Sequence, residues 1–174
     1  KDDDGIPLLK PVSCGRDGQA PVIIKLPTLR DEAFAIADHL ANAHQEGFAW
    51  GDMAVLCFDA KTRDLCAQAL AQRKLPVENR TRSGDFDPTS NKIKVMTMKV
   101  SKGLEFPVVA LPGVERLGHM GAEATEPGEG AQALSEAEAQ ARRDAARVLY
   151  VAATRATQRL MLASSTNKRA APPP

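Results

Sequence analysis

The sequence has no long apolar run and few cysteines. No stretch approaches the roughly 18 consecutive apolar residues that span a bilayer. The N-terminus also lacks the basic stretch and apolar run of a signal peptide. These absences argue against membrane and secreted classes, and we expect no membrane partner. The three cysteines (Cys14, Cys57 and Cys66) have spacings that match neither a zinc site nor a disulfide framework, which predicts free thiols in a reducing compartment, by default the cytoplasm.

A strong charge of one sign is also missing. The formal net charge of the 174 residues is +1, whereas domains that hold nucleic acid by charge alone are usually strongly basic. The charge is uneven, however. Residues 60–82 carry six basic and two acidic side chains, residues 91–116 carry five and two, and residues 121–141 carry five glutamates and no base. Such runs are commonly solvated faces; the sharper interpretation is a basic surface beside residues 91–106.

The motifs of self-sufficient nucleotide enzymes are absent as well. The chain has no G-x-x-x-x-G-K-[ST] phosphate loop, no G-x-G-x-x-G, no H-E-x-x-H and no G-x-S-x-G. A domain that binds and hydrolyses a nucleotide by itself is therefore not expected, and neither is a metal site.

Short apolar runs alternate with helical patterns along the chain. Continuous apolar runs typify strands of a parallel sheet that is covered on both faces. The predicted strands are 22–26 (a buried one), 53–58, a short 76–79, 93–98, 108–111 and 159–163. The pattern predicts an α/β fold with a doubly wound, mostly parallel sheet and helices on both faces.

Three helices are predicted between these strands. A capping box of Thr28 and Asp31 begins the first, which ends near Gly47. Asp59 caps the second, and a capping box of Ser135 and Glu138 begins a long helix that runs through Arg155. The core is expected at residues 21–166, with tails or cut points at 1–20 and 167–174.

The segment from Val95 to Phe106 carries polar groups directly after a predicted strand. Loops at the carboxyl ends of parallel strands are where such sheets bind ligands. Hydroxyl and ammonium donors there suit phosphate oxygens, Gly103 lets backbone approach a ligand, and Glu105 could accept a hydrogen bond from a sugar hydroxyl. The donors are Thr97, Lys99, Ser101 and Lys102. The plainer alternative is a strand-to-loop transition with solvated lysines.

The segment from Arg147 to Ala156 places an arginine near the end of an apolar helix. Arg155 follows Arg147 by two turns. An arginine on a rigid element aimed at a shared cleft can act as an arginine finger, whose planar donors neutralise charge on a transferring phosphoryl group. A cation at a helix C-terminus is also explained by the helix dipole alone.

Together and in this order, the two segments resemble motifs V and VI of UvrD/Rep-type superfamily 1 DNA helicases. T-x-x-x-S-K-G-L-E-F follows a strand, and L-Y-V-A-x-T-R-A precedes the last one. The similarity covers roughly residues 28 to 165. It implies a RecA-like fold, namely the second domain (2A) of a P-loop NTPase motor, without the phosphate loop.

The resemblance also implies roles for single residues. Arg155 matches the arginine that reaches the γ-phosphate of ATP, while Gly103 and Glu105 match positions beside the nucleotide. Thr97 and Ser101 match the side of motif V that faces single-stranded DNA; Lys99 and Lys102 belong to the same motif. ATP, with its Mg²⁺, would be held mainly by the N-terminal RecA-like domain of the same polypeptide.

Three features depart from the family pattern. Lys99 stands where the family commonly has histidine, and a lysine contacts phosphate as a point charge. A short loop between Pro76 and Ile93 replaces the large 2B insertion. The N-terminal motifs are absent, so the fragment alone is expected to be inactive.

The sequence thus predicts the 2A domain of an ATP-dependent 3′→5′ DNA helicase or translocase, of the kind that acts in DNA repair. Two alternatives stay open: a non-catalytic RecA-like module that binds DNA or a partner, and the helicase part of a helicase–nuclease.

Overall fold

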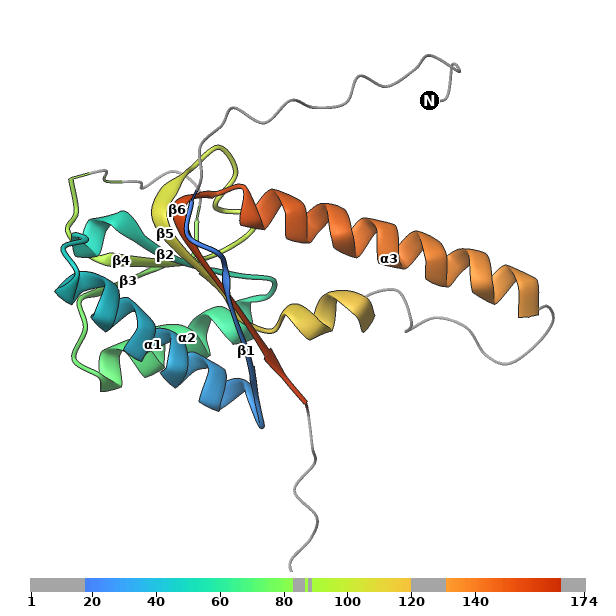
Figure 1. Ribbon diagram of the computed structural model, residues 1–174, viewed down its shortest axis with the longest axis horizontal. Coiled ribbons are helices and arrows are strands. Elements are labelled where there is room, and N and C mark those ends of the chain that lie inside the picture. Colours follow the sequence, from blue (N-terminus) through green and yellow to red (C-terminus); the bar gives the residue numbers. More distant parts are fainter. Residues whose placement is uncertain (1–17, 83–86, 88, 120–130, 167–174) are drawn as a thin grey trace, which may run out of the picture.

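The computed structural model describes residues 18–82, 87, 89–119 and 131–166, and these form a six-stranded sheet with helices on both faces (Figure 1). Every strand pairing is parallel. The strands are β1 (Val22–Leu26), β2 (Met53–Cys57), β3 (Val77–Arg80), β4 (Ile93–Thr97), β5 (Phe106–Leu111) and β6 (Ala156–Ser165), in the order β1-β6-β5-β2-β4-β3. The predicted doubly wound α/β fold is confirmed.

Two apolar clusters fill the space between the sheet and its helices. Helices α1 (Leu29–Gln45) and α2 (Ala60–Gln72) cover one face, and the C-terminal end of α3 (Ala131–Ala153) packs on the other, while the rest of α3 projects away from the sheet (Figure 1). Along β2, alternate residues join the two clusters, and all five are buried. This double coverage explains why the strand reads as one apolar run without polar alternation.

The N-terminus of α1 has the predicted capping box. The hydroxyl of Thr28 accepts a hydrogen bond from the Asp31 N–H at 3.2 Å, and the Asp31 carboxylate accepts one from the Thr28 N–H at 3.1 Å. The helix ends at Gln45, and Gly47 follows with a φ of 108°, in the left-handed region that glycine adopts freely.

Two predictions about the elements are wrong. The strand β1 is not buried, because it lies at the end of the sheet and pairs only with β6, which leaves Ile23 67% exposed. Helix α3 begins at Ala131, four residues before the predicted cap Ser135, and ends before Arg155. The Arg155 carbonyl accepts a hydrogen bond from the Phe106 N–H at 2.8 Å, so pairing with β5 replaces helical bonding there.

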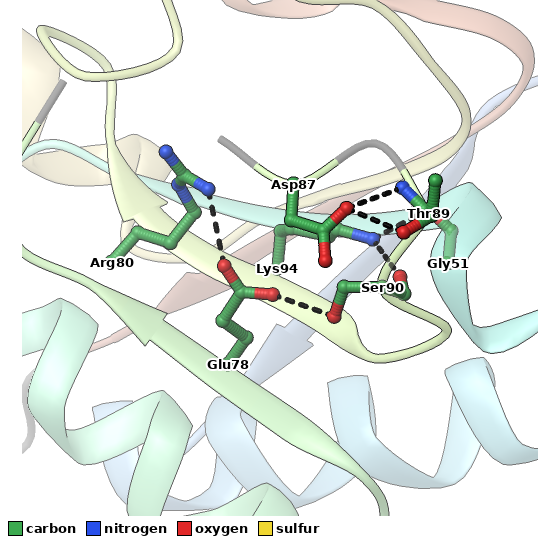
Figure 2. A network of polar contacts seen from close by, with 7 residues as sticks. All are labelled: Gly51, Glu78, Arg80, Asp87, Thr89, Ser90 and Lys94. Atoms are coloured by element: carbon green, nitrogen blue, oxygen red, sulfur yellow. Dashed lines mark hydrogen bonds and ion pairs between the residues drawn. The ribbon is translucent and has the colours of Figure 1, made fainter. Parts of the chain in front are cut away.

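A buried lysine forms hydrogen bonds with the backbone at the end of the short connection between β3 and β4 (Figure 2). Lys94 on β4 is 1% exposed, and its Nζ donates to the carbonyl oxygens of Ser90 at 2.5 Å and Gly51 at 3.3 Å. The Ser90 hydroxyl donates to Glu78 on β3 at 2.9 Å. A Cβ on Gly51 would lie 3.0 Å from the Ser90 carbonyl oxygen, so a larger residue there would require this backbone to shift by a few tenths of an ångström.

The predicted tails at 1–20 and 167–174 lie outside the described residues, apart from 18–20. Residues 120–130, which precede α3, lie outside them as well. No helix of the described part is long and apolar enough to cross a bilayer.

Candidate functional site

The connection from β4 to β5 runs along the strand direction from one side of the sheet to the other. The side formed by the carboxyl ends of the strands is called the carboxyl edge here, and the side formed by their amino ends the amino edge. Both strands are parallel to β2 and flank it, so the segment between them leaves at the carboxyl edge and re-enters at the amino edge. The strand register puts Thr97 about six residues beyond Phe106 along the strand direction, roughly 20 Å at the usual rise per residue. We call residues 98–105 the crossover.

Hydrogen-bonded turns shape the crossover. The N–H groups of Val100 and Ser101 donate to the Thr97 carbonyl at 2.9 and 3.1 Å, and the Leu104 N–H donates to the Ser101 carbonyl at 3.0 Å. Ser101 is 1% exposed, and its hydroxyl donates to the Met98 carbonyl at 3.0 Å. The hydroxyl predicted to face DNA thus has an internal partner, and a direct contact of Ser101 with DNA stays a prediction.

The charged side chains of the crossover point outward. Lys99, Lys102 and Glu105 are exposed, and none forms a hydrogen bond or ion pair with a described residue. Gly103 is exposed and has a φ of 81°, with nothing within 4 Å of a Cβ built on it. Glycine is required at this position by its backbone conformation and not by lack of space.

Arg155 lies in the turn between α3 and β6. Its guanidinium donates only to neutral oxygens: the Val151 carbonyl at 3.2 Å, the Leu104 carbonyl at 3.4 Å and the Thr154 hydroxyl at 3.4 Å. No carboxylate of the described residues lies within ion-pair distance. The side chain is therefore positioned while its charge is left uncompensated.

The predicted site residues separate into two groups. Phe106 pairs with Ala156, so the preceding residues, Glu105 and Arg155, lie level with each other at the amino edge of the sheet. Gly103 precedes Glu105 by two residues. Thr97 and Lys99, in contrast, lie at the carboxyl edge. One crossover thus joins two polar regions at opposite edges, whereas the sequence analysis expected the whole segment after β4 at the carboxyl ends of the strands.

A fixed ion pair lies at the carboxyl edge. Burial raises the pKa of Asp59, but hydrogen bonds from the Thr62 N–H and hydroxyl and the charge of Arg116 outweigh it and leave the pKa below its ordinary value. The Arg116 guanidinium lies 3.2 Å from Asp59. The neighbouring Cys57 is fully buried, and burial raises the pKa of its thiol, so it stays neutral and unreactive.

This geometry suits an anionic ligand at the amino edge. Arg155 offers planar donors to phosphate oxygens, and Glu105 offers an acceptor to hydroxyls. No group of three metal-ligating side chains occurs among the described residues. The oxygens of Val151, Leu104 and Thr154 that hold Arg155 were missed by the sequence reasoning. Two of them are backbone carbonyls, which no residue identity reveals.

Comparisons with known proteins bear on the family and the fold of this chain. The family model of the UvrD-like helicase C-terminal domain matches residues 79–167, which include the crossover, Arg155 and β6. No curated protein sequence matches the chain.

Among solved structures, the C-terminal domain of a possible DNA helicase from Lactobacillus plantarum superposes with a TM-score of 0.60. It is 18% identical, over 87% of this chain and 78% of its own length. The second domain of a DEAD-box helicase bound to an RNA duplex reaches a TM-score of 0.40 at 15% identity, over 84% of this chain and 54% of its own length.

The first of these structures shows that the fold is shared with a helicase domain. The family model covers just over half of the chain and includes both segments in which the site residues lie. The chain therefore belongs to the family of UvrD-like helicase C-terminal domains.

Proposed function

We propose that this chain is the second RecA-like domain of an ATP-dependent 3′→5′ DNA helicase or translocase, and that Arg155 is its arginine finger. The observation that carries the proposal is the state of Arg155, which is held by three neutral oxygens and has no acidic partner among the described residues. A guanidinium positioned in this way is ready to neutralise charge on a phosphoryl group delivered from outside the domain.

The amino edge would contact ATP that is bound mainly by an N-terminal RecA-like domain. When bound, ATP with its Mg²⁺ supplies the phosphoryl group that is transferred to water. Arg155 would bind the γ-phosphate, and Glu105 would accept a hydrogen bond from a sugar hydroxyl. The exposed backbone at Gly103 would allow the nucleotide to approach. Phosphoryl transfer depends mostly on positioning and charge neutralisation, so half of the site can belong to another domain.

The carboxyl edge and the crossover would contact single-stranded DNA. Lys99 and Lys102 are exposed and form no ion pair with a described residue, which leaves them available to phosphates, and Thr97 adds a hydroxyl. Ser101 would act on this surface through the turn that its hydroxyl holds. Because Lys99 replaces the usual histidine, its contact would be that of a point charge, which salt weakens.

The experiment compares Arg155→Ala with Arg147→Ala in the full-length protein. Arg147 is a matched control, since it is an exposed arginine of α3 that pairs with Asp144. We expect DNA-stimulated ATP hydrolysis to fall about a thousandfold or more in Arg155→Ala and to stay unchanged in Arg147→Ala. Equal turnover of the two variants would refute the finger.

The same preparation tests direction and DNA contact. Unwinding of duplexes with a 3′ tail, but not with a 5′ tail, is expected. Lys99→Ala should weaken binding of single-stranded DNA. Lys92→Ala should not, because Lys92 is an exposed lysine that immediately precedes β4. A full-length protein that binds DNA but never hydrolyses ATP would instead support the non-catalytic module. We further propose a cytoplasmic protein that acts in DNA repair.

A further inference from the structure

A shallow groove on the outer side of α1 and α2 is not used by the proposed motor. Its lining belongs to the helices on the sheet face opposite α3, and Arg155 is not part of it. Its cavity measures about 130 Å³. The groove, here called the α1–α2 groove, is lined by Arg30 and Phe34 of α1 and by Leu65, Gln68, Ala69 and Gln72 of α2.

Two guanidinium groups lie over one aromatic ring in this groove. The Cζ of Arg73 is 5.1 Å from the centre of the Phe34 ring, and the Cζ of Arg30 is 5.7 Å from it. Arg73 is held in place by two contacts with the Asp38 carboxylate, at 2.8 and 3.0 Å. Both guanidinium groups thus lie within cation–π distance of the ring.

The charges of the two arginines are not equally balanced. Asp38 neutralises Arg73, but no carboxylate of the described residues pairs with the exposed Arg30. No acidic residue lines the groove. Gln68 and Gln72 lie about one turn apart on α2, are exposed, and form no hydrogen bond with any described residue. The groove therefore combines three apolar side chains (Phe34, Leu65 and Ala69) with free amides and one uncompensated positive charge.

We propose that the α1–α2 groove binds an acidic peptide segment of a partner protein, anchored by one leucine- or phenylalanine-sized side chain. The groove's volume of about 130 Å³ leaves room for one such side chain against Phe34, Leu65 and Ala69. A carboxylate of the peptide would pair with Arg30, and the amides of Gln68 and Gln72 would bond its backbone.

Binding there would leave both edges of the sheet accessible. Arg155 and Lys99 lie at the edges, whereas the groove lies on the outer surface of two helices. A peptide in the groove would therefore recruit the protein to a partner without occupying the nucleotide or DNA regions. The proposal does not depend on the domain being part of an active motor.

The test uses a fluorescein-labelled peptide with a single leucine among aspartates, and a matched peptide with lysines in place of the aspartates. Binding to the 174-residue chain is measured by fluorescence polarisation. We expect saturable binding of the acidic peptide only. Arg30→Ala should weaken it about tenfold, as the loss of one charge-assisted hydrogen bond does.

Two further variants separate the groove from general charge effects. Gln68→Glu places a carboxylate in the groove on an exposed helix position and should abolish binding, while circular dichroism reports that the fold is intact. Lys61→Ala removes an exposed lysine of α2 outside the groove and should leave binding unchanged.

Three results would overturn the proposal. They are equal binding of both peptides, equal losses in Arg30→Ala and Lys61→Ala, and an acidic peptide that does not bind at all. Displacement of the peptide by single-stranded DNA that itself binds more weakly to Arg30→Ala would assign the groove to nucleic acid instead.

Discussion

Replacement of Lys94 tests whether a buried cation holds the β3–β4 connection in place. Lys94 is 1% exposed and ties two backbone segments together through its bonds to Ser90 and Gly51 (Figure 2). Lys94→Ala removes both the ammonium group and three buried methylenes. Lys94→Met removes the ammonium group and keeps a stem of similar length, so the pair of variants separates packing from hydrogen bonding.

The expected magnitudes follow from these contacts. Three buried methylenes contribute about 2 kcal/mol. Hydrogen bonds to a charged donor contribute about 1.5–3 kcal/mol each. Burial lowers the pKa of Lys94 below its ordinary value of 10.5, although Glu78 and Asp87 partly offset this. Burial thus disfavours the charged ammonium group, and this cost offsets most of the gain from its two hydrogen bonds. We therefore take their net contribution to the free energy of unfolding as about 1 kcal/mol. Lys94→Met should cost about 1 kcal/mol and Lys94→Ala about 3 kcal/mol.

The assay is urea unfolding of the 174-residue chain, followed by circular dichroism. Lys92→Met serves as the control, because Lys92 is exposed and immediately precedes the same strand. A Lys94→Met variant as stable as the unmodified chain, or more stable, would refute the reasoning. The cost of burying the ammonium group would then exceed the gain from its two hydrogen bonds.

Two further predictions concern the buried Glu32 of α1 and the crossover residue Gly103. Burial, and to a smaller extent the charge of Glu115, raise the pKa of Glu32 above its ordinary value of 4.5. The protonated Glu32 carboxyl group therefore stabilises the fold fully at pH values below 4.5. This stabilisation is lost as the pH rises through the pKa that Glu32 has in the folded state. Glu32→Gln should gain stability relative to the unmodified chain as the pH rises above 4.5 in urea unfolding, and a difference that stays constant with pH would contradict this. Gly103→Ala should cost about 1–2 kcal/mol, because a side chain is strained at its φ of 81° and not because of crowding. Unchanged unfolding would show that the crossover rearranges to avoid the strain.

The sheet and the helices that cover it could be predicted from the sequence, because a strand that is buried on both faces consists of consecutive apolar residues. The run Met53–Cys57 is apolar throughout, and each residue packs into one of two clusters. The cap at Thr28 is equally local, since its bonds span three residues. In contrast, the exposure of Ile23 depends on β1 lying at the end of the strand order, which no local pattern encodes.

The site residues could be predicted as residue types but not as an arrangement. The crossover and the Arg155 segment were found from their motifs. Their division between two edges follows from β4 and β5 flanking β2, which is a property of topology. The end of α3 before Arg155 likewise follows from pairing of its carbonyl with Phe106, a residue distant in sequence.

The most direct test of the central claim is to measure ATP affinity and single-turnover hydrolysis of the full-length Arg155→Ala variant side by side, in the presence of single-stranded DNA. A guanidinium that acts mainly on the transition state should lower the rate of hydrolysis about a thousandfold or more while the affinity for ATP changes far less. Hydrolysis at the unmodified rate, or a loss of affinity that accounts for the whole effect, would contradict the role assigned to Arg155.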